Sequence, residues 1–495
     1  AFFLTTIIAA YGVAAELTAR NHSLRWLLPL TVLLLPGFVD ILTSVNNDVG
    51  AVAFFSLFLW SGLRLIIRGF KWSRALLMLI LALICFFTKN TVMLALFMVP
   101  IPLALSYIPN RRFVWAGISS LIVLTLFGVF TWGAPLNWYS QRDQRSVDRV
   151  YDAQTPIGKF VFKFDLSPGA PPSRVYQLIP SGSYPLDSET VTLGAWIWAN
   201  KPVSVITPIL HIGDTQIQKE VKVDVTPKFF TVTGQVDSSN PPTLITISPV
   251  LSSTDETVSV FYDGITVVPG SWGNDQPPAF SDTSGREGAW GGKQFQNLVR
   301  NPSAEYSGPR LRGWVETFIA QRYPANPILF LGLLLDPVPL ENYYTTTIKS
   351  LLQTFWAKFG WGHVVIRGFH PYTILAVFTL MGIFGAAVSL VRTRKNIRWD
   401  IFLFLGFALL IVWGSAVLRG LPSVLDGSYF IPVARYAYPA IIPTMLILNI
   451  GWLEEISWIE KYIKIPKNVL LGILILCFVL LDMISIYSIN QYYIQ

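Results

Sequence analysis

Charged residues are scarce in this sequence of 495 residues. Asp, Glu, Lys and Arg together make up 13% of it, which is about half of the roughly 25% that is usual in soluble globular proteins. Hydrophobic residues make up 52%, and the mean hydropathy is +0.50. Apolar runs of about 20 residues, enough to cross a hydrocarbon core of about 30 Å, recur along the chain. The composition therefore argues against a soluble protein and predicts a membrane protein.

Cysteine and histidine are also rare. The two cysteines, Cys85 and Cys477, both lie inside apolar runs, so the sequence offers no disulfide framework and no cysteine-based metal site. The four histidines stand at the scattered positions 22, 211, 363 and 370, which do not have the spacing of a zinc site. We therefore expect neither a disulfide scaffold nor a zinc centre.

The sequence does not begin with methionine. It starts at Ala1, already inside an apolar run, and no basic segment or cleavage-site pattern stands in front of that run. We therefore expect the sequence to lack an N-terminal piece of the protein.

Apolar segments are abundant, and ten of them can be proposed as membrane spans. They are residues 1–18, 26–43, 49–67, 74–88, 91–108, 113–133, 371–391, 399–418, 436–453 and 468–489. Basic residues gather in alternate connections, as they do on the cytoplasmic side of membrane proteins. The net charge of +8 is therefore interpreted as a sign of topology and not of nucleic-acid binding. The other connections, including the long middle region, are predicted to be extracytoplasmic.

The middle region, residues 135–295, lacks helical periodicity. Short alternating or apolar segments are separated there by Gly, Pro, Ser, Asp and Asn, which predicts strands of an antiparallel sandwich. The predicted strands are 159–166, 175–179, 191–199, 203–211, 220–225, 229–236, 243–250 and 258–268. Residues 345–360 are amphipathic, and Trp356, Phe359 and Trp361 suit an interfacial aromatic belt.

The predicted fold is thus a polytopic α-helical membrane protein with about ten transmembrane helices and an inserted extracytoplasmic antiparallel β-sandwich. The first transmembrane region covers residues 1–133 and the sandwich 135–315. An interfacial, amphipathic connector at 316–370 leads to a second transmembrane region at 371–495.

Polar residues gather where the second proposed span ends and the third begins. Asp40 lies near the end of the second span, and Asn46, Asn47 and Asp48 stand directly before the third. One interpretation is a helix cap, in which Asp48 accepts hydrogen bonds from free N–H groups of the third span. A cap needs only one such residue, so the whole group suits a functional site equally well.

Two other loops on the predicted outer side carry cations. Lys89 follows the apolar run 75–87, where a cation is costly unless it snorkels or meets an anion. Arg435 and Tyr436 open the ninth proposed span. Arginine is a preferred ligand of phosphate oxygens, and its partner here is either a phosphate of a bound ligand or an outer-leaflet lipid headgroup. A carboxylate such as Asp48 beside two cations suits group transfer with a phosphate leaving group, because the acid takes a proton and the cations stabilise the departing phosphate.

These features resemble the GT-C superfamily of integral-membrane glycosyltransferases. Its members use polyprenyl-phosphate-linked sugars and include protein O-mannosyltransferases and the aminoarabinose transferases of lipid A. The resemblance rests on residues 46–48 opening a span, Lys89 closing another, and Arg435 with Tyr436 opening a late one. An uncharacterised bacterial branch is the most similar, since it also has an aromatic stretch like residues 355–361. The likeness covers about residues 1–133 and 345–455.

The resemblance implies that Asp48 is an acidic residue near the donor or a metal, and that Lys89 and Arg435 contact the lipid-linked phosphate. A lipid-linked sugar is the expected donor, and a divalent metal is left open as a cofactor. The remaining members of the predicted site are a second candidate carboxylate, a phosphate-binding neighbour of Arg435 and two supporting amides: Asp40, Tyr436, Asn46 and Asn47.

One feature of the superfamily is missing here. Its presumed catalytic base lies in a long external loop after the first span, whereas this sequence continues from its first span into a short basic connection. Either the sequence lacks an N-terminal piece or the protein has lost catalysis, and we expect the former.

The middle region resembles jelly-roll carbohydrate-binding modules. Residues 297–305, which include Asn301, are similar to the opening of such modules, and residues 262–267, which include Asp263, to their closing strand. Both motifs also suit simple turns. Four aromatic residues are candidates for stacking on sugar rings, with core packing as the alternative: Trp196, Trp198, Tyr262 and Trp272.

Two functions fit these observations. The first is a glycosyltransferase of a bacterial cytoplasmic membrane that moves a sugar from polyprenyl phosphate to an extracytoplasmic glycan or protein acceptor. The second is a catalytically inactive GT-C-like scaffold, or a subunit of a larger membrane complex, whose sandwich binds glycans or protein. A transporter ranks third, because no paired, interrupted hydrophobic segments are evident.

Overall fold

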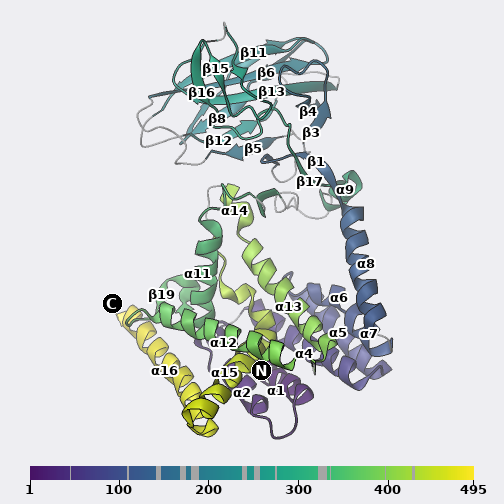
Figure 1. Cartoon of the computed structure of the whole chain (residues 1–495), viewed down its shortest axis with the longest axis vertical. Coiled ribbons are helices and arrows are strands. Elements are labelled where there is room, and N and C mark those ends of the chain that lie inside the picture. The colour runs from purple at the N-terminus through teal and green to yellow at the C-terminus, as the bar shows by residue number, and fades with distance from the viewer. Residues whose placement is uncertain are drawn as a thin grey trace. The chain divides into compact units, whose positions relative to one another are not determined.

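The structure is a computed structural model of the whole chain. It describes residues 1–44, 46–108, 111–140, 147–167, 174–179, 189–236, 242–249, 257–273, 276–320, 332–334, 336–395, 397–425 and 430–494. The chain forms two compact units (Figure 1). The membrane unit comprises Ala1–Leu121, Asn342–Gly420 and Tyr429–Gln495, and the β unit comprises Ile122–Glu341 and Leu421–Ser428.

Apolar helices build the membrane unit. Before the β unit they are α1 (Phe2–Leu17), α2 (Leu24–Leu33), α3 (Pro36–Thr43), α4 (Asn47–Arg68), α5 (Trp72–Thr88), α6 (Leu94–Met98), α7 (Pro100–Tyr107) and α8 (Arg111–Val129), whose last residues belong to the β unit. After it come α11 (Tyr343–Trp356), α12 (Pro371–Thr393), α13 (Trp399–Leu418), α15 (Ile441–Ile463) and α16 (Lys467–Ile494). Short 3-10 turns η3 (Ala434–Tyr436) and η4 (Tyr438–Ala440) precede α15.

Within the described residues, five helical stretches are long and apolar enough to cross a membrane: α4, α12, α13, η4 with α15, and α16. A sixth span results if α2 and α3, which meet at a bend of 62°, count as one. The predicted number of ten spans is therefore not supported. Hydropathy alone overcounts because Pro100 begins a new helix inside residues 91–108, and because α1 and α5 have only 16 and 17 residues.

Close helix packing holds the membrane unit together. A Cβ atom on Gly451 of α15 would overlap the carbonyl oxygen of Gly382 of α12, so only glycine permits this crossing. Trp356 and Phe359 belong to the same hydrophobic core, and both are buried. The structure therefore corrects the prediction of an interfacial belt for these two rings. The side chain of Trp361 lies outside the described residues.

The β unit is built on two five-stranded antiparallel sheets (Figure 1). One has the order β11-β6-β13-β4-β3 and the other β2-β5-β12-β8-β9. Their strands are β2 (Tyr139–Ser140), β3 (Asp148–Tyr151), β4 (Phe160–Leu166), β5 (Val175–Leu178), β6 (Thr190–Ala199), β8 (Ile209–Ile212), β9 (Thr215–Ile217), β11 (Lys228–Gln235), β12 (Pro242–Ile247) and β13 (Val258–Pro269).

Alternating apolar residues of both sheets, such as Ile197, Val260 and Ile245, form a shared buried core. Each of the eight predicted segments contains a strand, although residues 203–211 divide into β7 (Val203–Ile206) and β8 around Pro208. Smaller sheets complete the unit. They pair β7 with β10 (Glu220–Val223), β1 (Phe130–Pro135) with β17 (Ser307–Leu311), and β15 (Glu287–Trp290) with both β14 (Ala279–Phe280) and β16 (Lys293–Gln296).

The pairing of β1 with β17 brings the beginning and the end of the sandwich together, as an inserted domain requires. Asn301 supports this junction. It has a left-handed φ of 50°, and its side-chain amide donates to the carbonyl oxygens of Leu136 and Tyr306 at 2.8 and 2.9 Å. The Asn301 side chain therefore fixes turns at this junction.

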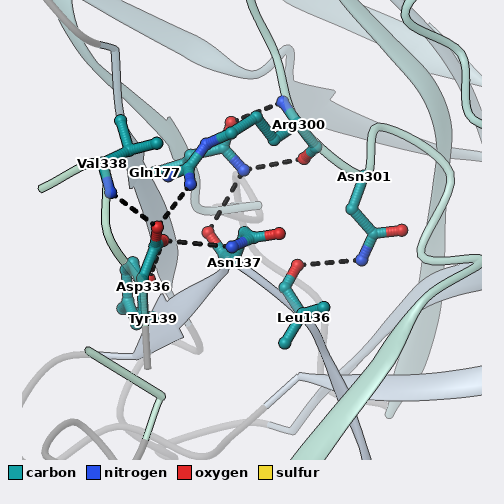
Figure 2. A network of polar contacts seen from close by, with 8 residues as sticks. All are labelled: Leu136, Asn137, Tyr139, Gln177, Arg300, Asn301, Asp336 and Val338. Carbon is teal, nitrogen blue, oxygen red and sulfur yellow. Dashed lines mark hydrogen bonds and ion pairs between the residues drawn. The ribbon is translucent and has the colours of Figure 1, made fainter. Parts of the chain in front are cut away.

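A buried polar network ties residue Asp336 to the sandwich (Figure 2). The Asp336 carboxylate accepts hydrogen bonds from Tyr139, from Asn137 at 3.1 Å and from the Arg300 guanidinium at 2.6 Å. The backbone N–H of Val338 donates to the same carboxylate at 3.1 Å. Burial raises the pKa of Asp336, but the donors from Arg300 and Tyr139 outweigh it and hold the pKa below its usual range.

Candidate functional site

The polar group at the start of α4 is organised by Asn46. The side-chain oxygen of Asn46 accepts hydrogen bonds from the N–H groups of Asp48 and Val49, at 2.8 and 3.2 Å. Asn46 is therefore the N-cap, and the predicted capping role of Asp48 is wrong. Asn47 is exposed, whereas Asp48 is buried. Because Asn46 satisfies the helix terminus, the Asp48 carboxylate is available for a different partner.

That partner is Lys89. Its ammonium group donates to the Asp48 carboxylate and forms an ion pair with it. Lys89 is the C-cap of α5 and is 41 residues away from Asp48 in sequence. Its side chain is 15% exposed and that of Asp48 7%, so bulk water screens this pair only in part. The structure thus joins two residues that the sequence identified separately.

Tyr436 connects this ion pair to Arg435. Three cations lie over its ring: the Lys89 ammonium at 5.8 Å, the Arg419 guanidinium at 4.1 Å and the Arg435 guanidinium at 4.8 Å from the centroid. Arg435 also donates a hydrogen bond of 2.7 Å to the Tyr436 hydroxyl. These are cation–π distances. Tyr436 is buried and therefore acts as a support for the surrounding cations.

The end of α11 fixes the position of Arg435. The Thr354 hydroxyl accepts from the Ala434 N–H at 2.8 Å, and the Tyr438 hydroxyl donates to the Thr354 carbonyl at 3.0 Å. Arg435 therefore lies on a short segment, η3–η4, that is hydrogen-bonded on both sides of it. A guanidinium held in this way loses less freedom when it binds an anion.

Arg435 lines a pocket of about 270 Å³ within the membrane unit. We call it the Asp40 pocket. Asp40 and Asn46 from the start of the chain meet Lys358 and Arg435 from its second half in the lining. Asp48, Lys89 and Tyr436 are not lining residues but lie behind it, through the contacts of Tyr436 with Arg435. The pocket thus combines one carboxylate with two cations.

Lys358 is the lining residue that sequence reasoning missed. It lies in β18 (Lys358–Phe359), which pairs with β19 (Val364–Val365) in a small hairpin after α11. The surrounding aromatic residues suggested a membrane interface, and under this interpretation Lys358 was not considered as a site residue. A signal did exist, because residue 358 is the one charged position in the aromatic stretch 355–361.

The aromatic residues proposed for sugar stacking divide into two pairs. Tyr262 is fully buried in the sandwich core, and Trp198 is 2% exposed and stacks on Phe261 at 5.5 Å. These two rings therefore present no face to a sugar, which corrects the prediction for them. Trp196 and Trp272 are half-buried, and for them stacking stays a prediction.

The described residues contain no group of three or more His, Cys, Asp or Glu side chains that could hold a metal ion. The Asp40 pocket in particular has Asp40 as its single carboxylate among its lining residues. The chemistry available there is proton transfer by a carboxylate and charge stabilisation by lysine and arginine.

Comparisons with known proteins give a limited result. No family model and no curated protein matches the sequence. Among solved structures, one described as "CBM4 structure and function" is similar over 27% of this chain and 95% of its own, at 12% identity and a TM-score of 0.20. TmCBM61 in complex with β-1,4-galactotriose is similar over 28% and 92%, at 15% identity and a TM-score of 0.22.

A family 16 carbohydrate-binding module also matches, over 25% of this chain and 84% of its own, at 21% identity and a TM-score of 0.18. At these TM-scores the likenesses say nothing about what this chain binds.

Proposed function

We propose that this chain is a membrane glycosyltransferase that moves a sugar from a polyprenyl-phosphate donor to an extracytoplasmic acceptor. The observation that supports the proposal is the Asp40 pocket, where a carboxylate and two cations line the same cavity. The arrangement offers a proton acceptor and phosphate ligands, which are the groups that such a transfer requires. The resemblance to the GT-C superfamily supplies the class of donor.

In the proposed reaction Asp40 acts as the base. It removes the proton from an acceptor hydroxyl, whose oxygen forms a bond to the anomeric carbon of the sugar. The bond from that carbon to the phosphate oxygen breaks, and its electron pair leaves with the polyprenyl phosphate. Arg435 stabilises the negative charge that develops on this phosphate. An attack from the opposite face inverts the anomeric centre, as the resemblance implies.

Asp48 and Lys89 act as positioning residues in this proposal. They neutralise each other and hold a cation over the ring of Tyr436, which in turn accepts a hydrogen bond from Arg435. This assignment changes the predicted roles of Asp48 as the catalytic carboxylate and of Lys89 as a phosphate ligand. Asp40 is preferred as base because it is the carboxylate in the pocket lining.

The alternative proposal is a catalytically inactive scaffold or subunit of a membrane complex. The mutual pairing of Asp48 and Lys89 favours it to some degree, because an ion pair that is already complete needs no substrate. On this alternative the β unit binds a glycan or a protein, and the Asp40 pocket binds a lipid headgroup without catalysing a reaction.

A measurement of sugar transfer distinguishes the two proposals, because only the glycosyltransferase releases polyprenyl phosphate from a lipid-linked sugar. The full chain in lipid nanodiscs is given a panel of polyprenyl-phosphate hexoses and pentoses, and the release of free polyprenyl phosphate is followed by mass spectrometry. We expect Asp40→Asn to reduce release at least 100-fold, a typical contribution of general base catalysis, and Arg435→Met to have an effect of about the same size.

Lys395→Met is the matched control, because Lys395 is exposed directly after α12 and does not line the pocket. It should release product at the wild-type rate. Wild-type release that Asp40→Asn and Arg435→Met leave unchanged would remove the site assignment. Absence of release with every donor in the panel would favour the scaffold.

A further inference from the structure

The hairpin that carries Lys358 forms part of the wall of the Asp40 pocket. Its turn runs through Gly360 and Gly362, which both line the pocket and have left-handed φ angles of 56° and 95°. Residues with a Cβ atom rarely adopt these angles. The turn closes the hairpin directly after Phe359, whose ring is buried in the hydrophobic core. Lys358 is therefore held by an anchored hairpin at the pocket.

The surroundings of Lys358 contain a neutral partner and a repelling charge. Its ammonium group donates to the side-chain oxygen of Gln353 at 3.2 Å, and in the described part of the chain no carboxylate forms an ion pair with it. Burial, and then the charge of Lys349, lower the pKa of Lys358. A half-buried ammonium in such a position is stabilised by an anion that enters the pocket.

We infer that Lys358 is a second phosphate-binding residue, which together with Arg435 holds the phosphate of a lipid-linked donor and binds it more tightly as it departs. This inference rests on the proposed function. The donor is a phosphodiester with one negative charge, whereas the leaving polyprenyl phosphate is a monoester that reaches two. Two cations therefore favour the departing group over the donor, which is the differential stabilisation that accelerates a reaction.

The remaining lining suits a phosphate attached to an apolar chain. Ile41, Val433 and Tyr438 lie in the same lining, beside the apolar spans of the membrane unit. A free phosphate gains nothing from these residues, whereas a prenyl chain buries apolar surface against them. The ligand class is thus an isoprenoid phosphate monoester or diester.

The experiment measures binding, without turnover, to the full chain in nanodiscs at pH 8. The probes are farnesyl phosphate, which is a dianion at this pH, its methyl diester, which is a monoanion, farnesol and inorganic phosphate. We expect the affinity for farnesyl phosphate to exceed that for each of the other three. Lys358→Met should weaken farnesyl phosphate binding about tenfold or more and the methyl diester by about threefold, because a charge-assisted hydrogen bond is stronger to the more highly charged phosphate.

Lys358→Arg, which keeps the charge, should recover most of the lost affinity, and Lys395→Met should bind like the wild type. The midpoint of thermal unfolding of each variant shows that the change is not a folding defect. Equal weakening of both esters would remove the preference for the departing phosphate, and unchanged binding by Lys358→Met would remove the residue from the site. Inorganic phosphate that binds as tightly as farnesyl phosphate would overturn the assignment to a lipid-linked ligand.

These outcomes are separate from those of the proposed function. A wild-type chain that binds farnesyl phosphate through Lys358 but transfers no sugar would contradict the glycosyltransferase and leave the phosphate site standing. A chain that transfers sugar equally well with Lys358→Met would contradict the phosphate site and leave the glycosyltransferase standing. Wild-type protein that binds none of the probes would overturn the inference itself.

Discussion

Each unit of the molecule contains a buried ion pair, and the two pairs differ in what surrounds them. In the β unit, the Asp336 side chain is 1% exposed and receives hydrogen bonds from Arg300, Tyr139, Asn137 and the Val338 N–H. In the membrane unit, Asp48 pairs with one cation among the described residues, Lys89, whose ammonium group also lies over the ring of Tyr436. The first pair is surrounded by hydrogen-bond donors. The second is connected through Tyr436 to Arg435, which lines the Asp40 pocket.

The difference shows how an ion pair's role can be inferred from its neighbours. A buried carboxylate whose acceptor positions are occupied by fixed donors contributes to the stability of one conformation, and removal of a partner leaves a costly buried charge. An ion pair that continues through an aromatic ring to another cation can also orient that cation. We therefore expect the Arg300–Asp336 pair to govern stability and the Asp48–Lys89 pair to govern ligand binding.

The largest expected effect comes from Arg300→Met. It leaves Asp336 buried without its cation, and the free energy of unfolding of the β unit should fall by about 3–5 kcal/mol. Hydrogen exchange of the β5 and β12 amides in the full chain measures this loss. The double variant Arg300→Met/Asp336→Asn should lose less, and farnesyl phosphate binding should stay at the wild-type level. If Arg300→Met lost farnesyl phosphate binding and kept its stability, the expected division of roles between the two ion pairs would be wrong.

Asp48→Asn should have a smaller effect on stability, about 1–3 kcal/mol in the membrane unit. The amide oxygen that replaces the carboxylate oxygen can still accept a hydrogen bond from Lys89, so the ammonium group keeps a partner. Asp48→Asn should also reduce transfer about tenfold through kcat, since Arg435 is less well oriented. Asp48→Asn/Lys89→Met should recover stability without recovering transfer. Recovery of both would show that the pair is merely structural.

The smallest expected effect concerns how the stability of the β unit depends on pH. Burial raises the pKa of Asp263 to about 7, against hydrogen bonds from Thr155 and Ser303. The folded state therefore holds more protons than the unfolded state between about pH 4 and 7, so stability should increase as the pH falls through this range. The slope for one group is at most about 1.4 kcal/mol per pH unit.

Asp336 acts with the opposite sign. Its pKa in the folded protein lies below the usual value for aspartate of about 3.9, so its contribution to stability is complete above about pH 4 and is lost as the pH falls further. Unfolding by denaturant at several pH values, followed by tryptophan fluorescence, should show a maximum near pH 4. Asp263→Asn should abolish the increase between pH 7 and 4. An unchanged increase would mean that another group titrates.

The strands of the sandwich could be predicted from the sequence because alternation is a local property. The Asp48–Lys89 pair could be suspected for a similar reason, since each residue stands at the end of an apolar run. The contribution of Lys358 to the pocket depends on the hairpin after α11, which depends on long-range packing of Trp356 and Phe359. Hydropathy likewise could not foresee the bend between α2 and α3, because a window averages across proline.

The glycine contact between α12 and α15 has a consequence for the distant pocket. The hairpin with Lys358 lies shortly before α12, and the segment with Arg435 lies directly before α15. The crossing of Gly382 and Gly451 sets how near these two helices approach, and therefore the spacing of the two cations that precede them. A methyl group added at this crossing, about three turns into each helix, would push the two helices apart and, on the proposed function, change which phosphates the protein can accept.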